Sequence, residues 1–175
     1  MRKLKVTELN RISVEEFKEA KKLPLIVVLD NVRSVYNVGS VFRTCDAFRI
    51  ESIYLCGISA QPPQVELHKT ALGAEFTVDW QYYKDTREAI KSLQEQGYIV
   101  YSVEQAEGST MLQDLQLDKS KKYAIVMGHE VKGVQQEVVD MSDGCIEIPQ
   151  YGTKHSLNVS VTTGIVIWDL FNKLR

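Results

Sequence analysis

The sequence predicts an α/β protein built on a mostly parallel sheet of six strands, with helices on both faces of the sheet. Short runs rich in β-branched and aromatic residues recur along the chain, and segments with apolar residues at helical spacing separate them. Strands that alternate with helices are typical of parallel sheets, because each helix carries the chain back to the end where the next strand begins. The predicted strands are Leu25–Leu29, Ser52–Cys56, Phe76–Trp80, Tyr98–Val103, Tyr123–Met127 and Cys145–Ile148.

The composition is that of a globular protein in a reducing compartment. The chain has 175 residues, 44% hydrophobic and 25% charged, so it is long enough to bury a core. No apolar run reaches the length of a membrane span, and the charged start is not followed by the apolar segment of a signal peptide. An odd number of scattered cysteines predicts a cytoplasmic location without a disulfide framework. These cysteines are Cys45, Cys56 and Cys145.

The histidines and the net charge argue against two kinds of site. His68, His129 and His155 are not spaced as zinc ligands, so no metal is expected. The net charge of −2 disfavours bulk binding of nucleic acid, so any RNA contact has to come from a local basic face. Residues 1–23 are expected to form a basic helical arm in front of a single domain at residues 24–175. The basic residues of the arm are Arg2, Lys3, Lys5, Arg11, Lys18, Lys21 and Lys22.

Capping residues predict where two of the helices begin. Ser13 and Glu16 have the S-x-x-E spacing of a capping box, and the helix that follows is expected to end before Pro24. Asp85 is expected to cap a helix that ends at Gly97. The segments expected to be loops include residues 57–75 and 106–110.

The segment after the first strand is predicted to be a helix that carries a candidate functional arginine. From Val38 to Phe48 apolar residues recur at helical spacing and mark a buried stripe. Arg43 lies off this stripe, on the side of Gly39. Because helical side chains lean toward the start of their helix, Arg43 is expected to pass over Gly39 and reach the loop that bears Asn37. That would place a guanidinium at the carboxyl edge of the sheet, where open α/β proteins bind their ligands.

The C-terminal stretch has the pattern of an anion-binding helix start. The strand Cys145–Ile148 is followed by a loop with proline and glycine at Pro149–His155, and then by a helix that is apolar nearly all round. Ser156 and Asn158 lie where this helix begins, so side-chain oxygens and free backbone N–H groups converge there. Lys154 adds a positive charge beside them, which favours binding of an anion. The alternative is that Ser156 only caps a buried helix.

Common nucleotide-binding and nucleophile motifs are missing. Gly128 and Gly133 have the G-x-x-x-x-G spacing of a phosphate loop, but Val134 and Gln135 follow instead of Lys and Ser or Thr, which disfavours nucleotide hydrolysis. No G-x-G-x-x-G follows a strand, and no serine lies in G-x-S-x-G. Three polar, glycine-bearing loops after three strands remain as the candidate site.

These three loops resemble the motifs of the SpoU (TrmH-type) RNA 2′-O-ribose methyltransferases of the SPOUT superfamily. The resembling motifs are Asn37-x-Gly39-x-x-x-Arg43, Gly128-x-Glu130, and Ile148-Pro149 with Ser156-Leu157-Asn158. Their order and spacing fit, and the similarity runs from about Leu25 to the C-terminus. The resemblance implies a trefoil knot in the C-terminal part of the fold, S-adenosylmethionine as the methyl donor, and a homodimer. The function that the resemblance implies is methyl transfer to a ribose 2′-hydroxyl of tRNA or rRNA.

The resemblance also implies which residues hold the methyl donor. Main-chain groups and apolar walls are expected to surround it, without charges, which suits a cationic donor. The implied donor-binding residues are Val103, Met127, Gly128, Ile148, Gln150 and Leu157. Two positions depart from the family pattern: Gln150 stands where many relatives have methionine, and His129 stands where relatives often have a small or amide side chain.

The same resemblance assigns the catalytic residues Asn37, Arg43, Glu130, Ser156 and Asn158. Ser156, Asn158 and the helix start would hold an RNA phosphate. Arg43 would lie at the reacting hydroxyl, where a guanidinium is better suited to stabilise the developing alkoxide than to accept a proton. Glu130 would anchor either Arg43 or Asn37 through a charge-assisted hydrogen bond.

The apolar C-terminal helix predicts a two-fold homodimer. A helix that is apolar all round is not stable on the surface of a monomer, so a second copy is expected to cover it together with the helix at Asn37–Phe48. Its apolar residues are Leu157, Val161, Ile165, Val166, Trp168, Leu170 and Phe171.

Three other functions are alternatives to ribose methylation. A methyltransferase that acts on a base nitrogen is disfavoured by the pairing of the S-L-N and N-x-G-x-x-x-R motifs. An inactive RNA-binding or assembly factor on the same fold is disfavoured by the intact set of polar site residues. An oxidoreductase that uses a dinucleotide is disfavoured because the glycine fingerprint is missing.

Overall fold

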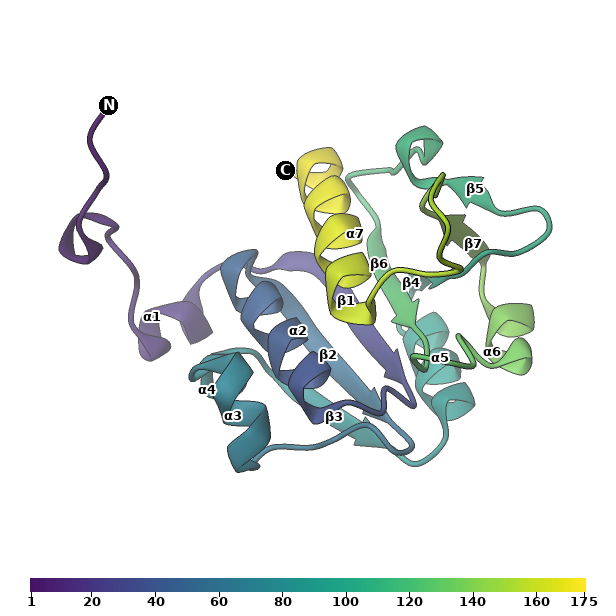
Figure 1. Ribbon diagram of the computed structural model, residues 1–175, viewed down its shortest axis with the longest axis horizontal. Helices are drawn as coiled ribbons and strands as arrows, with labels where there is room; N and C mark the ends of the chain where they lie inside the picture. Colours follow the sequence, from purple (N-terminus) through teal and green to yellow (C-terminus); the bar gives the residue numbers. More distant parts are fainter.

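The protein is built on one sheet of seven parallel strands, described by a computed structural model that covers residues 1–175. The strands are β1 Leu23–Asp30, β2 Ile50–Cys56, β3 Trp80–Tyr83, β4 Tyr98–Val103, β5 Thr110–Met111, β6 Lys122–Met127 and β7 Gly144–Glu147. Across the sheet their order is β3, β2, β1, β6, β4, β7, β5 (Figure 1). The predicted α/β class and parallel sheet are confirmed, but the number of strands is seven and not six.

Helices cover both faces of this sheet (Figure 1). Their bounds are α1 Val14–Glu19, α2 Val35–Ala47, α3 Val65–Ala71, α4 Ala74–Thr77, α5 Thr86–Glu95, α6 Gln136–Met141 and α7 Val159–Leu174, with 3₁₀ turns η1 Val6–Glu8 and η2 Leu112–Asp114. Helices α2, α3, α4 and α7 pack on one face, and α5 and α6 pack on the other. No helix is long and apolar enough to cross a membrane.

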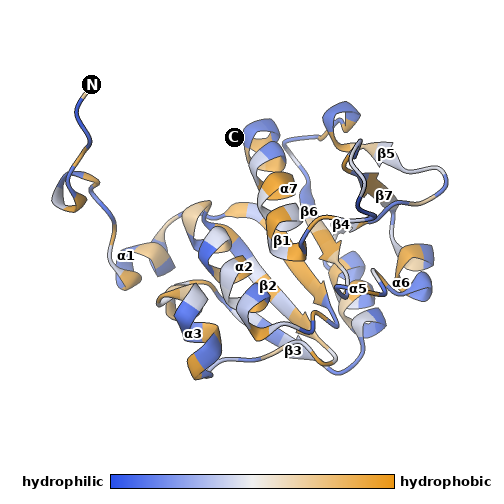
Figure 2. Cartoon of the chain, in the orientation of Figure 1, coloured by the Kyte–Doolittle hydropathy of each residue, from blue (hydrophilic) through white to orange (hydrophobic).

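The central strand β1 shows why the sheet needs helices on both faces. Leu25, Val27 and Leu29 belong to the hydrophobic cluster beneath α2 and α7, whereas Ile26 and Val28 belong to the cluster beneath α5 and α6. Successive side chains of a strand point to opposite faces, so a continuous apolar run is buried on both. Figure 2 shows the same result as orange strands at the centre of the sheet.

Two strand predictions were wrong at the edges of the sheet. β5 lies partly in the segment 106–110 that was expected to be a loop, and it pairs with β7 through Thr110 and Met111. A strand of two residues carries no readable alternation of polar and apolar side chains. The predicted strand Phe76–Trp80 also moves, because Ala74–Thr77 is helical and β3 begins only at Trp80.

The segment expected to be a loop at residues 57–75 contains helix α3 and the start of α4. Helix α3 packs directly on α2, and Gly39 makes this close approach possible. A Cβ atom at Gly39 would lie 2.1 Å from the Thr70 Oγ1 atom and 2.3 Å from the Leu67 carbonyl oxygen. Gly39 therefore allows the two helices to pack closely. This packing explains why the N-x-G-x-x-x-R motif has a glycine, without reference to a ligand.

Residues 1–13 project away from the sheet as an extended arm (Figure 1). The predicted capping box is present: the Glu16 N–H donates to Ser13 Oγ at 3.1 Å, and the Ser13 N–H donates to Glu16 Oε2 at 2.7 Å. The helix that follows, α1, is joined to the domain mainly by Phe17, which is buried. Every residue before Phe17 is exposed.

Candidate functional site

A cavity of about 1010 Å³ opens at the carboxyl edge of the sheet, beside the ends of β4, β6 and β7. Its walls are the loop after β4, the loop after β6, and the long loop between β7 and α7. The carboxyl ends of parallel strands meet at one edge, so loops that are distant in sequence converge there. All six residues expected to bind the methyl donor line this cavity: Val103, Met127, Gly128, Ile148, Gln150 and Leu157.

The loop after β6 closes on itself, and its two glycines make this possible. The His129 N–H donates to the Gly133 carbonyl at 3.1 Å, and the Gly133 N–H donates back to the His129 carbonyl at 2.8 Å. Gly133 has a φ of +69°, which favours glycine. A Cβ atom at Gly128 would lie 2.2 Å from the Gly133 carbonyl carbon. The G-x-x-x-x-G spacing therefore closes a tight loop over the cavity.

Glu104, which the sequence analysis missed, fixes this loop from the neighbouring strand. It follows β4 directly, and its Oε2 atom accepts the Val134 N–H at 3.0 Å. Its Oε1 atom accepts the Gln105 N–H at 2.9 Å. The signal in the sequence was only a charged residue immediately after a buried strand. No motif marked it, because its partner Val134 is 30 residues away.

Glu130 joins the loop after β6 to the start of α2. Its carboxylate accepts the Arg33 N–H at 2.8 Å, the Ser34 N–H at 2.9 Å and the Asn37 Nδ2 group at 3.1 Å. Burial raises the pKa of Glu130, but these hydrogen bonds outweigh it, so the pKa lies below its ordinary value. Of the two predicted anchoring partners, Asn37 and Arg43, the carboxylate holds Asn37.

Asn158 extends the same network to α7. Its Nδ2 group donates to Asn37 Oδ1 at 3.2 Å, and its Oδ1 atom accepts the Ser160 N–H at 2.9 Å. Asn158 is therefore the residue that caps α7. Ser156 lies two residues earlier, is exposed, lines the cavity and forms no hydrogen bond within the chain. The alternative in which Ser156 serves only as the helix cap does not hold.

Arg43 stands apart from these residues. It is exposed, its guanidinium forms no hydrogen bond or ion pair within the chain, and it does not line the cavity. Arg43 comes six residues after Asn37. At 3.6 residues per turn, their side chains leave α2 in directions about 120° apart. Asn37 turns toward α7, whereas Gly39, near Arg43, turns toward α3. The expectation that Arg43 reaches the loop of Asn37 is therefore wrong for a single chain.

Asp30 is a second residue that the sequence analysis missed. It ends β1 and is only 1% exposed, yet its carboxylate accepts four hydrogen bonds. The donors are Asn31 Nδ2, the Thr86 hydroxyl at the start of α5, and both the N–H and the side-chain amide of Gln135 before α6. Asp30 thus fixes the sheet edge behind the cavity loops.

The cavity is more acidic than expected. Four carboxyl side chains line it, whereas Lys132 is the only lysine or arginine that does. The acidic residues are Glu104, Glu107, Glu130 and Asp140. None of them forms an ion pair. The six residues expected to bind the donor are uncharged, and the carboxylates stand beside them in the same cavity, where they favour a cationic ligand.

Comparison with known proteins agrees with this geometry. The SpoU rRNA Methylase family matches residues 24–168. The tRNA (guanosine(18)-2′-O)-methyltransferase of Thermus thermophilus is 30% identical over 163 residues, which are 93% of this chain and 82% of that protein. The 23S rRNA (guanosine-2′-O-)-methyltransferase of Vibrio parahaemolyticus is 30% identical over 162 residues, which are 93% of this chain and 64% of that protein.

Solved structures share the fold closely. The TrmH/SpoU tRNA modifying enzyme of A. aeolicus superposes with a TM-score of 0.80 at 27% identity, over 91% of this chain and 80% of that one. The AdoMet-bound rRNA methyltransferase of Sinorhizobium meliloti superposes with the same TM-score and identity, over 91% of this chain and 60% of that one. Because the family match spans most of the residues and the motif loops surround one cavity, the chain belongs to the SpoU rRNA methylase family.

Proposed function

We propose that the protein transfers a methyl group from S-adenosylmethionine to a ribose 2′-hydroxyl of tRNA or rRNA. The observation that carries this proposal is the cavity, in which all six expected donor-binding residues meet Glu130, Ser156 and Asn158. Relatives that carry the names of tRNA and rRNA 2′-O-methyltransferases match 93% of the chain, which supports the same activity here.

The residues of the cavity fit the methyl donor. Its sulfonium supplies the methyl group and leaves as a neutral thioether. Gly128 lets the loop after β6 approach closely, since a side chain there would meet the Gly133 backbone. The carboxylates of Glu104 and Glu130 favour a cation in the cavity, while their hydrogen bonds keep the loops in place. Catalysis would then rest mainly on holding donor and acceptor in line.

The RNA side of the site would be the start of α7. The hydroxyl of Ser156 has no partner within the chain, and α7 is a 16-residue helix whose positive end lies beside it. Ser156, Asn158 and this helix start would bind a phosphate next to the target ribose. Asn37, held by Glu130 and Asn158, would position the start of α2 against them.

We further propose a two-fold homodimer through α2 and α7. Val161, Ile165 and Trp168 form a stripe along α7 and are 51%, 39% and 54% exposed, and Tyr36 on α2 is 49% exposed. An exposed apolar stripe of this kind fits a second copy of the chain. Arg43 lies on the outer face of α2 and far around the helix from the residues of its own cavity. If it acts in catalysis, it would therefore act in the site of the partner, where a guanidinium can stabilise the developing alkoxide.

The C-terminal segment is proposed to form the trefoil knot that the family resemblance implies. Strand β7 lies between β4 and β5, two strands that precede it in the chain. The segment after β7 consequently starts from inside the sheet, and α7 returns to pack on α2.

Residues 1–23, which precede the family match at residues 24–168, are proposed to be an added arm. Three free thiols are compatible with the predicted cytoplasmic location.

The test is methyl transfer followed by identification of the product. Purified protein would be incubated with labelled S-adenosylmethionine and unmodified tRNA or rRNA, and the RNA would then be digested to nucleosides for mass spectrometry. A ribose-methylated nucleoside is expected. A base-methylated nucleoside would favour the alternative acceptor, and RNA binding without any methylation would favour the inactive assembly factor.

A further inference from the structure

Three basic residues lie on three loops that contain or contact residues of the cavity wall. Arg33 lies between β1 and α2, Lys132 lies in the loop after β6, and Lys154 lies in the loop before α7. Lys132 lines the cavity directly. Arg33 and Lys154 each adjoin a residue of the wall: the Arg33 N–H donates to Glu130 at 2.8 Å, and Lys154 precedes His155. We call these three residues the basic rim.

The backbone of each rim residue is held in place while its charged group is free. The Lys132 N–H donates to His129 Nδ1 at 3.2 Å, and the carbonyl of His155, next to Lys154, accepts Gln105 Nε2 at 2.6 Å. The charged ends of Arg33, Lys132 and Lys154 form no hydrogen bond or ion pair within the chain, and all three residues are exposed. Their charges are available to an external ligand.

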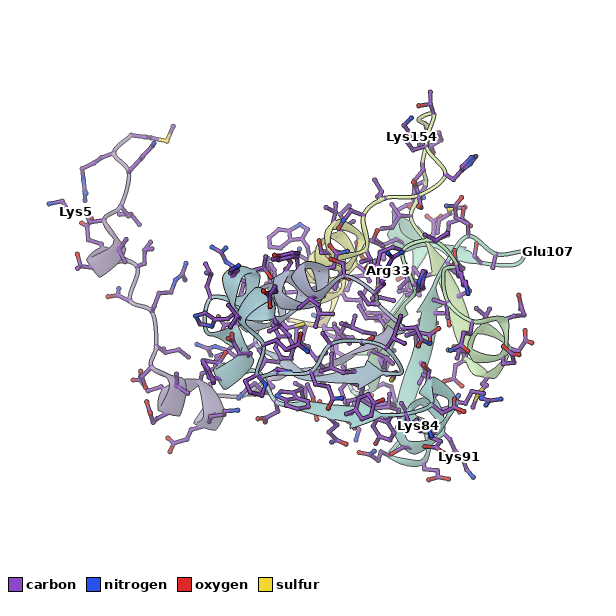
Figure 3. The ribbon with its side chains drawn as sticks, turned by 60° about the horizontal axis from the view of Figure 1, so that its bottom comes forward. Lys5, Arg33, Lys84, Lys91, Glu107 and Lys154 are labelled. Carbon is purple, nitrogen blue, oxygen red and sulfur yellow. The ribbon has the colours of Figure 1, made fainter.

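The rim residues lie beside acidic residues of the cavity without forming ion pairs with them. Figure 3 shows Lys154 on a protruding loop, Arg33 nearer the body of the domain, and Glu107 on a different projection. The starts of α2 and α7 meet, since Asn37 and Asn158 are hydrogen-bonded at 3.2 Å. Both helix starts carry partial positive charge. A rim of positive potential therefore borders a cavity with acidic walls.

We propose that the basic rim is the RNA-docking surface and that it binds the phosphates on either side of the target nucleotide. This inference rests on the proposed function. Phosphates are the ligand that matches a free arginine and two free lysines on loops that border the cavity. The rim also explains how a chain with a net charge of −2 binds an anionic polymer, because the local charge counts and the total does not.

The basic arm at residues 1–23 is the competing location for this contact. Lys3, Lys5 and Arg11 are also exposed and free of side-chain partners. However, the arm exposes Leu4 and Val6 beside these charges, with 61% and 82% of their surface accessible. Exposed apolar side chains of this kind suit a protein surface better than a phosphate backbone.

The experiment compares two variants that each lose three positive charges. One carries Arg33→Gln, Lys132→Gln and Lys154→Gln, and the other carries Lys3→Gln, Lys5→Gln and Arg11→Gln. The affinity for unmodified RNA is measured over a range of salt concentrations, and the affinity for S-adenosylhomocysteine is measured by calorimetry. Each phosphate contact contributes a slope of about 0.7 in a plot of log affinity against log salt for single strands. The rim variant should therefore lose about 2 in slope and bind RNA roughly 10- to 100-fold more weakly at physiological salt.

The calorimetry separates failure of this inference from failure of the proposed function. Because Lys132 lines the cavity, the control for donor binding is the double variant Arg33→Gln, Lys154→Gln. It should bind S-adenosylhomocysteine as the wild type does, which also shows that it is folded, and it should show part of the loss in RNA affinity. The inference would be overturned if the slope of log affinity against log salt fell in the arm variant and stayed unchanged in the rim variant. The proposed function would survive that result as long as the wild type still methylates RNA. A wild type that neither methylates nor binds RNA would overturn both.

Discussion

Asn158 donates a hydrogen bond to Asn37 across 3.2 Å and so joins the first turn of α7 to the first turn of α2, 121 residues earlier in the chain. Asn37 passes the connection on to Glu130, whose carboxylate also binds the N–H groups of Arg33 and Ser34. Three loops of the candidate site therefore share one hydrogen-bond network. A change at any of these side chains should affect the relative positions of both helix starts.

Replacement of Glu130 by alanine tests how strongly this network holds the site. Glu130→Ala leaves two backbone N–H groups and one amide without their acceptor, so the free energy of unfolding should fall by about 1–3 kcal/mol. Chemical denaturation measures it. Glu137→Ala is the matched control, because Glu137 is exposed on α6 and outside the cavity, and its effect should stay within about 0.5 kcal/mol. Equal effects of the two substitutions would contradict a central role for Glu130.

The pH dependence of stability should reveal the same carboxylate. The pKa of Glu130 lies below its ordinary value of 4.5 because hydrogen bonds to the charged form outweigh burial. A group whose pKa is lower in the folded state contributes stability above its unfolded pKa and loses it as the pH falls through the folded value. The difference in unfolding free energy between the wild type and Glu130→Gln should therefore be constant near pH 6 to 7 and shrink below about pH 4.5. Denaturation curves at a series of pH values would show whether the difference stays constant instead.

Arg43→Lys should reduce methyl transfer without affecting donor binding. Lysine keeps the charge and a similar helix propensity but cannot reproduce the two-pronged geometry of the guanidinium. Loss of one such group in a transition state costs roughly 3–4 kcal/mol, so the rate should fall on the order of a hundredfold or more. Because Arg43 does not line its own cavity, calorimetry should give nearly the same affinity for S-adenosylhomocysteine. Turnover close to the wild type would remove Arg43 from the mechanism.

Mixed dimers test whether Arg43 acts in the partner's site. Arg43→Ala and Ser156→Ala would be mixed after unfolding and refolding together. In a mixed dimer, the Arg43→Ala chain has an intact Ser156, and the Ser156→Ala chain has an intact Arg43. These two residues meet in one site only if the arginine acts across the interface. Half of the dimers are then mixed and half of their sites are active, so about a quarter of the wild-type activity should return. Mixed dimers that form but remain inactive would place Arg43 in its own site.

The acidic cavity should discriminate between the methyl donor and its product. S-Adenosylmethionine carries one more positive charge than S-adenosylhomocysteine. A carboxylate about 8 Å from that charge contributes roughly 0.5–2 kcal/mol, so Glu104→Gln should weaken donor binding roughly 2- to 30-fold and leave product binding nearly unchanged. Glutamine keeps one acceptor oxygen, which retains the hydrogen bond from the Val134 N–H, while the Gln105 N–H on the exposed side loses its acceptor. Thermal shifts or calorimetry with both ligands measure the ratio, and an unchanged ratio would show that Glu104 acts only on the loop.

The parts of this fold that sequence could predict are those with local causes. The run at Leu25–Leu29 is apolar on both faces, and it is a central strand. The loops that follow β6 and β7 meet because parallel strands end at one edge. The recognition of the family was confirmed for the same reason, since its motifs lie in these loops.

The parts that sequence could not predict depend on contacts between distant segments. Asp30 and Glu104 look like ordinary charged residues after strands, and their partners lie 105 and 30 residues farther along the chain. β5 owes its existence to pairing with β7 rather than to its own two residues. The direction of the Arg43 side chain, in contrast, could have been predicted from sequence. Its six-residue spacing from Asn37 already places the two side chains on different sides of a helix.

Asp30 makes the sheet edge beneath the cavity open as one cooperative unit. Its carboxylate is buried and simultaneously holds β1, the start of α5 and the residue before α6. Detaching any one of these segments alone would leave a buried charge short of donors, so partial opening is costly compared with unfolding of the whole region. The backbone N–H of Gln135 lies just before a helix of only six residues. Fraying of a helix end would normally allow rapid hydrogen exchange at such a position. Here that amide should exchange as slowly as the central strands, and it becomes a local reporter of global unfolding.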